Sequence, residues 1–297
     1  MKSIQEIQAF VLSTAQLEER GLNRQQLQRQ VRQGTLRKIR RGSYAPSDWW
    51  ENLQPSDKYL ASLVAHQQHM GPKTLFSHHS AAALHGLAQL TIPQQIHLAA
   101  PRGRANAREG IKVHQLGERK GIILHQLPVT NLLSTVLDCV ASCDPREGLV
   151  LADSALAKGL AQDELLEALQ QAQGRGCRKA RLLAPWVSPL SESAGESLVR
   201  YFLLTRSFPP AEQQYWVRQG SRRYRLDFAW PSYGVLLEFD GNIKYQNYRP
   251  REQAFLQQNE REAWLRSQGW QVVRTNWKEV LYRPHLLEQR LRQALGI

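Results

Sequence analysis

The chain has 297 residues, 42% of them hydrophobic, and carries a formal net charge of +13 at pH 7. Its length predicts about two domains of ~100–200 residues each, and it contains no run of about 20 apolar residues that could form a transmembrane helix, so no membrane partner is expected. Three cysteines are too few for a disulfide framework, while the excess of Lys and Arg favours a polyanionic partner over a merely soluble basic protein. Residues 1–8 carry an acid and amides where a signal peptide has its apolar core, and we therefore expect a cytoplasmic protein.

Two short helices joined by a tight turn are predicted near the N-terminus. Residues 14–20 form the first helix and residues 24–33 the second, which ends at Gly34. Asn23, in the turn, is placed to cap the second helix. The inward face of this helix-turn-helix comprises Leu17, Leu22, Leu27 and Val31. The outward face of the second helix carries side chains that suit base edges and phosphates, namely Arg24, Gln25, Gln28, Arg29 and Arg32.

Residues 35–45 alternate apolar and basic positions around Gly42, as the two strands of a wing do. Such a wing packs Leu36, Ile39 and Tyr44 inward. It places four cations along a DNA backbone, namely Arg37, Lys38, Arg40 and Arg41. The alternative is a solvated basic hairpin in a purely structural subdomain.

Residues 5–46 resemble the N-terminal winged helix of AbiEi-type antitoxins from type IV toxin–antitoxin (abortive infection) systems. In that family the second helix is followed by a wing that begins at a glycine and a leucine, carries basic residues and ends at a glycine and a tyrosine, as residues 34–44 do. The resemblance implies DNA as the partner. It also allows a cognate toxin and a second copy of the chain, since winged-helix repressors usually read inverted repeats as dimers.

The next region continues this resemblance and predicts a mixed α/β portion. Residues 75–87 are similar to the helix that follows the winged helix in the same family. Strands are predicted at residues 96–99 and 111–114, separated by the basic loop 101–108.

Most of the nine histidines lie between His66 and His125. A zinc site needs a tight histidine pair with cysteine or carboxylate partners, and the nearest such pair, His66 and His69, has no cysteine close by in the sequence. We therefore expect helix-capping and core histidines in preference to ligands. Cys139 and Cys143 are one helical turn apart, which indicates two small buried side chains.

Two apolar strands, each of which carries an acidic residue, are predicted in the last third of the chain. Residues 224–230 and 234–240 are these strands, joined by a turn that begins at Pro231. If the strands are adjacent, Asp227 and Glu238 lie side by side. Two such carboxylates repel each other, and one tends to keep its proton unless a hard divalent ion binds both.

Further groups gather at the end of the second strand. Asp240 lies two residues beyond Glu238 and faces the same side. Phe239 between them points into the core, and Lys244 follows the break at Gly241. Acids and a lysine gathered in this way suit metal-assisted phosphodiester hydrolysis, with Mg²⁺ or Mn²⁺ as the cofactor.

From Ser191 to the C-terminus the chain resembles the PD-(D/E)XK restriction-endonuclease-like superfamily, and within it the small domains related to very-short-patch-repair (Vsr) endonucleases. The landmarks follow in family order: Glu196 on an amphipathic helix, Pro210 and Gln213, Asp227, Glu238 to Gly241, a helix at 252–267 and a strand at 269–275. The resemblance implies a metal-dependent DNA endonuclease in bacterial defence or toxin–antitoxin biology. It makes Asp227 and Glu238 metal ligands, with Asp240 or Glu196 completing the metal shell. Lys244 would orient the attacking water or stabilise the developing charge.

The sequence departs from the superfamily pattern at one position. A lysine is expected two residues after the second acid, where Asp240 stands, and the nearest lysine is Lys244. A long flexible side chain can reach the same point from a neighbouring position, which keeps the endonuclease interpretation. The alternative is a non-catalytic AbiEi-like antitoxin and transcriptional autorepressor that uses a degenerate nuclease fold for binding.

Arginines and aromatic residues flank the acidic centre. They are Arg218, Arg222, Arg223 and Arg225 before Asp227, and Tyr245, Tyr248, Arg249 and Arg251 after Lys244. Such interleaving fits a DNA-facing surface, with a solvated loop as the competing interpretation. Ser191 is expected to cap the helix that carries Glu196.

The predicted fold class is therefore α/β (α+β), in three parts. Residues 1–50 form a winged helix-turn-helix, residues 51–185 an α/β companion region, and residues 186–297 a mixed-sheet core flanked by helices, as in restriction endonucleases.

Overall fold

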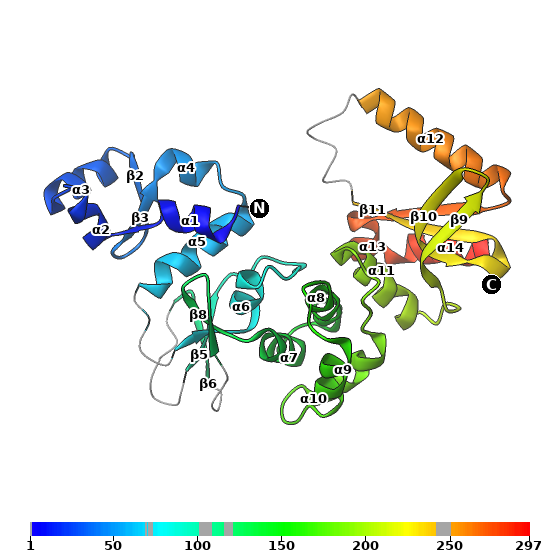
Figure 1. Cartoon of the computed structure of the whole chain (residues 1–297), viewed down its shortest axis with the longest axis horizontal. Helices are drawn as coiled ribbons and strands as arrows, with labels where there is room; N and C mark the ends of the chain where they lie inside the picture. Colours follow the sequence, from blue (N-terminus) through cyan, green and yellow to red (C-terminus); the bar gives the residue numbers. More distant parts are fainter. Residues whose placement is uncertain (1, 69, 71–73, 101–108, 116–120, 242–250) are drawn as a thin grey trace.

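Three β-sheets, each with its own helices, form the part of the chain that the computed structural model describes (Figure 1). That part comprises residues 2–68, 70, 74–100, 109–115, 121–241 and 251–297. Helices and mixed sheets alternate along it, which confirms the predicted α+β class. No helix within these residues is long and apolar enough to cross a membrane.

The N-terminal unit is a three-stranded sheet in the order β1-β3-β2, with three short helices. Its elements are α1 (Ile4–Phe10), β1 (Leu12–Ser13), α2 (Thr14–Glu19), α3 (Arg24–Arg32), β2 (Leu36–Arg40) and β3 (Ser43–Pro46). As predicted, Asn23 caps α3, and its side chain accepts the backbone N–H of Gln26 at 2.9 Å. β2 and β3 pair antiparallel on either side of a turn containing Gly42, which has φ = 79°, so the predicted wing is confirmed.

The middle unit is a mixed five-stranded sheet in the order β6-β5-β4-β8-β7, with helices before and after it. Its elements are α4 (Ser47–Glu51), α5 (Pro55–Gln67), β4 (Leu75–Phe76), α6 (His78–Leu84), β5 (Ile96–Ala100), β6 (Ile111–Gln115), β7 (Gly121–Leu124), β8 (Leu127–Thr130), α7 (Leu132–Ser142), α8 (Pro145–Ala157), α9 (Gln162–Gln170), α10 (Cys177–Leu183) and the 3-10 turn η1 (Ala184–Trp186). The predicted strands at 96–99 and 111–114 are β5 and β6, which are parallel neighbours. The basic loop 101–108 and His69 lie outside the described residues.

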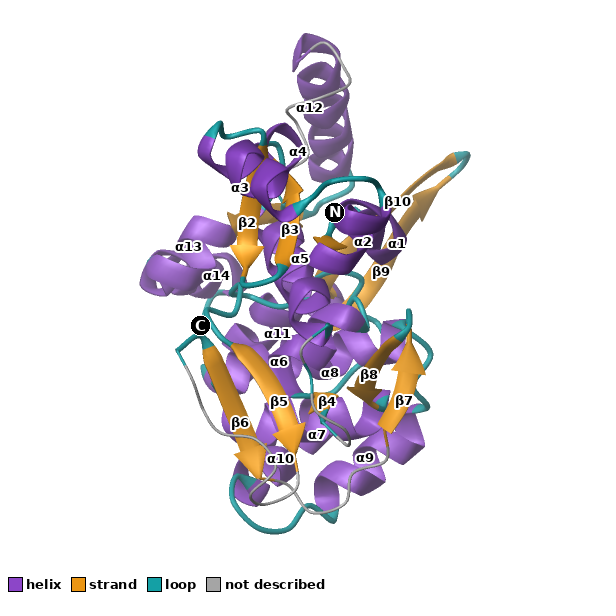
Figure 2. Ribbon diagram, turned by 90° about the vertical axis from the view of Figure 1, so that its left-hand side faces the viewer, coloured by secondary structure: helices purple, strands orange, loops and turns teal. Residues whose placement is uncertain are grey.

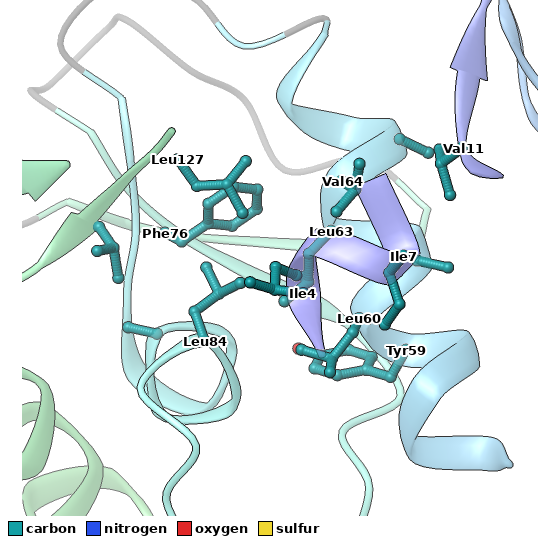
Figure 3. Packing of buried hydrophobic residues seen from close by; sticks show 14 of the residues in the cluster. Ile4, Ile7, Val11, Tyr59, Leu60, Leu63, Val64, Phe76, Leu84 and Leu127 are labelled. Atoms are coloured by element: carbon teal, nitrogen blue, oxygen red, sulfur yellow. The ribbon is translucent and has the colours of Figure 1, made fainter. Parts of the chain in front are cut away.

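One hydrophobic core joins α1 to the middle unit. Ile4 and Ile7 of α1 pack together with Leu60 and Leu63 of α5 and with Phe76 of β4 (Figure 3). All five side chains are buried. This core therefore contains residues from both sides of position 50.

A separate small core holds α2, α3 and the wing together. Leu12, Leu17 and Leu27 are buried in it, and Leu22, Leu36 and Tyr44 pack at its edge. Because Leu27 is the buried residue of α3, the opposite side of that helix is left to solvent.

The C-terminal unit is a four-stranded sheet in the order β12-β11-β10-β9. Its elements are α11 (Ala194–Thr205), β9 (Glu212–Gln219), β10 (Arg222–Trp230), the 3-10 turn η2 (Pro231–Tyr233), β11 (Val235–Asp240), α12 (Arg251–Ser267), β12 (Gln271–Asn276), α13 (Trp277–Tyr282) and α14 (Pro284–Leu295). β9, β10 and β11 are antiparallel, whereas β11 and β12 are parallel. A parallel pair needs a crossover connection, and α12 lies in that connection.

Helices cover both faces of this sheet. Leu237 faces a core shared with α11, α13 and α14. Its neighbour Leu236 faces a second core, to which α12 contributes Trp264 and Leu265. This alternation is that of a strand buried on both sides.

The cap of α11 differs from the prediction. Ser193, and not Ser191, is the N-cap, and its hydroxyl accepts the backbone N–H of Glu196 at 3.2 Å. Ser193 stands three residues before Glu196, which is the spacing of a capping box, so the helix begins two residues later than expected. Ser191 is buried.

Candidate functional site

Helix α3 presents polar side chains to solvent around the part of its surface that Leu27 does not occupy. All five side chains predicted for this face are exposed, namely Arg24, Gln25, Gln28, Arg29 and Arg32. The capping box at Asn23 fixes where the helix starts. Guanidinium and amide groups at this spacing can donate to, and accept from, base edges.

A groove separates α3 from the wing, which lies beside it in Figure 2. Its volume is about 560 Å³. Arg24, Gln28 and Arg32 line it from α3, and Lys38 and Arg41 line it from the wing. One acid, Glu18, is among its described lining residues, so the groove is net positive and suits an anionic ligand.

Two of the predicted wing residues lie apart from this groove. Arg40 is half-buried, and its guanidinium contacts the ring of His66 on α5. Arg37 is exposed, and its guanidinium lies 4.0 Å from the carboxylate of Glu51. The structure therefore gathers Lys38 and Arg41 with α3, and turns Arg40 toward the middle unit.

The C-terminal sheet brings two of the predicted acids side by side. Phe228 and Leu237 form the last registered pair of β10 and β11, and Asp227 and Glu238 are the next residues along each strand. Asp227 Oδ2 accepts the backbone N–H of Phe239 at 2.7 Å. Burial raises the pKa of Asp227 to about 6, and the charge of Glu238 adds to this rise, while the Phe239 hydrogen bond opposes it.

Strand β10 is irregular at Asp227. Leu226 and Ala229 both pack into the core against α12, whereas Phe228 packs into the opposite core. In a regular strand Leu226 and Phe228 would face the same side, so the alternation of side chains between the two faces is shifted between Leu226 and Ala229. On β9, Gln214 lies between Gln213 and Tyr215, the partners of Phe228 and Leu226, and has φ = 54°.

Glu238 is neutralised by two arginines. Arg261 of α12 lies 2.5 Å from Oε1, and Arg274 of β12 lies 3.6 Å from Oε2. Neither arginine stands out in the sequence. Both come from elements beyond Glu238 in the chain, and only the parallel pairing of β11 with β12 brings Arg274 opposite it.

Glu196 is bound into the start of α11. Its carboxylate accepts the N–H of Glu192, the hydroxyl of Ser193 and the amide of Gln214, all within 3 Å. Burial raises the pKa of Glu196, and the charge of Asp227 contributes to this rise. Glu196 therefore lies near Asp227 and Glu238, and its own carboxylate oxygens are already hydrogen-bonded.

An open pocket of about 900 Å³ lies at the end of β11. Glu238 and Asp240 line it together with Arg261, Arg274 and Gln258. Lys244 lies outside the described residues, as do Tyr245, Tyr248 and Arg249.

Asp227 and Glu238 offer a divalent ion two carboxylate ligands. Within the described ranges no group of three His, Cys, Asp or Glu side chains is placed to hold a metal. Mg²⁺ is often bound by only one or two carboxylates, with water and substrate phosphate as its other ligands. The donor chemistry of Asp227 and Glu238 therefore fits such an ion, on condition that Arg261 releases Glu238.

Histidines from three elements also meet, which the sequence did not indicate. His78 of α6 stacks on His114 of β6 with ring centroids 3.5 Å apart, and His114 Nε2 lies 3.1 Å from Nδ1 of His97 on β5. Burial lowers the pKa of His97 to about 3 and that of His114 to about 4, so both rings are neutral at pH 7. His79 stands edge-on to His97.

Comparison with known proteins supports the interpretation of the N-terminal unit. Residues 1–47 match a family described as "Transcriptional regulator, AbiEi antitoxin", which confirms the predicted resemblance for this segment. The chain is 29% identical to the uncharacterized protein MT2308 of Mycobacterium tuberculosis (strain CDC 1551 / Oshkosh), over 92% of this chain and 97% of that protein. The same values hold for the uncharacterized protein Rv2248 of strain ATCC 25618 / H37Rv. A crystal structure of the RV2827C protein from the same species aligns with 73% of this chain and 87% of that one, at a TM-score of 0.39 and 14% identity.

Proposed function

We propose that this protein is a DNA-binding transcriptional regulator of the antitoxin type, which binds duplex DNA through α3 and the wing. The observation that carries the proposal is the groove in which Arg24, Gln28 and Arg32 of α3 face Lys38 and Arg41 of the wing. It lies in the segment that matches AbiEi antitoxin regulators. A cytoplasmic location, a cognate toxin and a homodimer on an inverted repeat belong to the same proposal.

The two sides of the groove have different tasks in this proposal. Helix α3 enters the major groove, where an arginine can bind guanine and a glutamine can bind adenine. The wing follows the DNA backbone, where Lys38 and Arg41 neutralise phosphates and fix the register. Specificity then comes from α3, and a large part of the affinity from both elements.

Footprinting on the DNA upstream of the protein's own gene tests this function. We expect protection of an inverted repeat by the full chain. Gln28→Ala should weaken binding by about 1–3 kcal/mol and relax specificity at one base position. Lys38→Ala should weaken binding to all sequences alike and reduce the slope of log K against log salt by about 0.9. Arg178→Ala, an exposed charge on α10, is the matched control and should leave the footprint intact.

A second candidate function is metal-dependent phosphodiester hydrolysis. The cross-strand placement of Asp227 and Glu238 and the raised pKa of Asp227 favour it, because a cation would relieve the repulsion between the two acids. Asp227 and Glu238 would hold Mg²⁺ or Mn²⁺, with Asp240 or Glu196 completing the shell. Such an ion supplies Lewis acidity and lowers the pKa of bound water.

Calorimetric titration with Mg²⁺ and Mn²⁺, combined with plasmid nicking, tests this candidate. Binding and nicking that both vanish in Asp227→Asn would support it. Absence of both in the wild type would reject the endonuclease and leave the C-terminal unit as a binding domain. EDTA should abolish any nicking that depends on these carboxylates.

A further inference from the structure

The hairpin of β9 and β10 forms an arm that extends beyond the rest of its sheet (Figure 2). β11 pairs only with residues 228–230 of β10, whereas β9 pairs with β10 out to Arg222. The outer half of the hairpin therefore has no third strand among the described pairings. Its two faces are very different in chemistry.

One face of the arm is apolar and anchored. Val217 and Leu226 are buried there, and Tyr215 and Tyr224 pack beside them. The partner on this side is α12, which contributes Trp264 and Leu265 to the same core. The arm is thus fixed to the domain by this face, and within the described part of the chain the side chains of the opposite face are left exposed to solvent.

The uncovered face is a cluster of arginines around one tryptophan. Trp216 pairs with Arg225 across the hairpin, and Arg218 pairs with Arg223, so the four side chains share a face. The guanidinium carbons of Arg218, Arg223 and Arg225 lie 5.3, 5.6 and 6.0 Å from the centre of the Trp216 ring. Trp216 is 41% exposed, and cation–π attraction holds the arginines over it.

Most of this charge is not neutralised by the protein. Arg225 pairs with Glu192 at 2.6 Å. For Arg218 and Arg223, the described part of the chain provides no carboxylate partner, and both are exposed. Like charges held this close repel each other, so the arrangement is favourable chiefly when a polyanion binds to it.

We propose that this face is a second DNA-binding surface, which grips the phosphate backbone of duplex DNA without reading its sequence. Arginine binds phosphate oxygens in bidentate fashion, and residues two apart on a strand are about 7 Å apart, which presents them as a row. The ring of Trp216 is engaged by guanidiniums and is not free to stack on an unpaired base, which favours duplex over single-stranded DNA. The proposal extends the DNA-binding function proposed above but uses none of the residues of α3 or the wing.

Salt-dependent binding of the full chain to a random-sequence duplex tests the arm. In Arg218→Ala/Arg223→Ala the slope of log K against log salt should fall by about 1.8, since each lost phosphate contact contributes about 0.9. Arg218→Lys/Arg223→Lys keeps the charge and should retain most of the slope. The matched control Arg175→Ala/Arg178→Ala removes the same charge from exposed positions near and on α10 and should leave the slope unchanged.

The outcomes separate this proposal from the proposed regulator. If Arg218→Ala/Arg223→Ala leaves the salt-dependence slope unchanged and the promoter footprint intact, the arm does not bind DNA, and the proposed regulator function is unaffected. If the slope falls in Arg218→Ala/Arg223→Ala but the wild type gives no promoter footprint, DNA binding by the arm is supported and the proposed regulator function is rejected. An equal loss in the control pair would show that overall charge alone is responsible, and preferential binding of a single strand through the arm would overturn the duplex assignment.

Discussion

Glu147 is a buried acid that gives the fold a pH dependence. It lies on α8, and its carboxylate accepts the backbone N–H of Leu90 at 3.0 Å. Burial raises its pKa from 4.5 to about 7, although the Leu90 hydrogen bond opposes the rise. Because the pKa is higher in the folded state than in the unfolded state, the folded chain binds the extra proton between about pH 4.5 and 7. Stability therefore falls as the pH rises through this window.

Glu147→Gln should remove this loss of stability. The amide oxygen can still accept the Leu90 N–H, and the side chain stays neutral at every pH. We expect the variant to exceed the wild type by about 1–2 kcal/mol in free energy of unfolding at pH 8, after allowance for solvent screening, and to match it at pH 4.5. Urea titrations at the two pH values measure the difference. Glu164→Gln, at an exposed position on α9, serves as the control; equal stability of Glu147→Gln and wild type at pH 8 would contradict the assignment.

Individual residues of the candidate site differ in how far the sequence could predict them. The acids Asp227 and Glu238 stand out in the sequence because each lies on an apolar strand. Arg261 and Arg274, which neutralise Glu238, occupy a charged helix and an ordinary strand with no local pattern to mark them. Only the fold shows that they reach Glu238.

The contact between α11 and β11 depends on one glycine. Gly195 lies in the first turn of α11, and a Cβ built there would overlap the ring of Phe239 on β11. Phe239 also stands edge-on to Trp277 of α13, with ring centroids 5.1 Å apart. The ring of Phe239 thus contacts both α11 and α13.

Gly195→Ala should therefore destabilise the C-terminal unit despite the better helix propensity of alanine. We expect a loss of about 1–3 kcal/mol in free energy of unfolding from overpacking. Gly195→Ala/Phe239→Leu should recover part of it, because the smaller side chain makes room for the methyl group. Gly174→Ala is unsuitable as a control, because Gly174 has φ = 76° and the substitution would itself strain the backbone. Ser142→Ala on α7 is the control, because it leaves the contact between Gly195 and Phe239 unchanged. A Gly195→Ala protein as stable as the wild type would refute the packing argument.

Elements with local signals were the ones that sequence could predict. The cap at Asn23, the turn at Gly42 and the strands that become β5 and β6 are each set by a few neighbouring residues. The start of α11 was misjudged by two residues because Ser191 and Ser193 are both good caps, and the choice between them depends on Glu196. The histidine cluster could not be predicted at all, because its rings come from α6, β5 and β6.

Across the whole molecule, a buried ion pair connects the middle and C-terminal units. Asp153 of α8 is 1% exposed and accepts from Arg200 and Ser197, both on α11. It also accepts the backbone N–H of Ser188, in the segment between the units, at 2.9 Å. Three hydrogen bonds thus converge on one carboxylate at this junction.

Asp153→Ala should be among the most destabilising single changes in the chain. Removing one partner leaves Arg200 buried without its counter-charge, which typically costs about 3–5 kcal/mol. The pair of Arg146 with Asp144 provides a contrast, since it is largely exposed and its loss in Arg146→Ala should cost less than about 1 kcal/mol. Denaturant unfolding of both variants measures the difference, and similar losses in the two would contradict the role given to Asp153.

The division of the N-terminal cores bears on how residues 12–46, the segment proposed to bind DNA, could be exchanged. Val11 belongs to the core shared with α5, whereas its neighbour Leu12 belongs to the small core under α3. The hydroxyl of Ser43 donates to the carbonyl of Ala65 at 3.2 Å, so the wing is tethered to α5 as well. This segment is therefore an insert between α1 and the helices that follow the wing. A chimera that grafts a different specificity should exchange residues 12–46 and keep α1, because a transplant that starts at the N-terminus would carry away the apolar face of Ile4 and Ile7 and leave the recipient core incomplete.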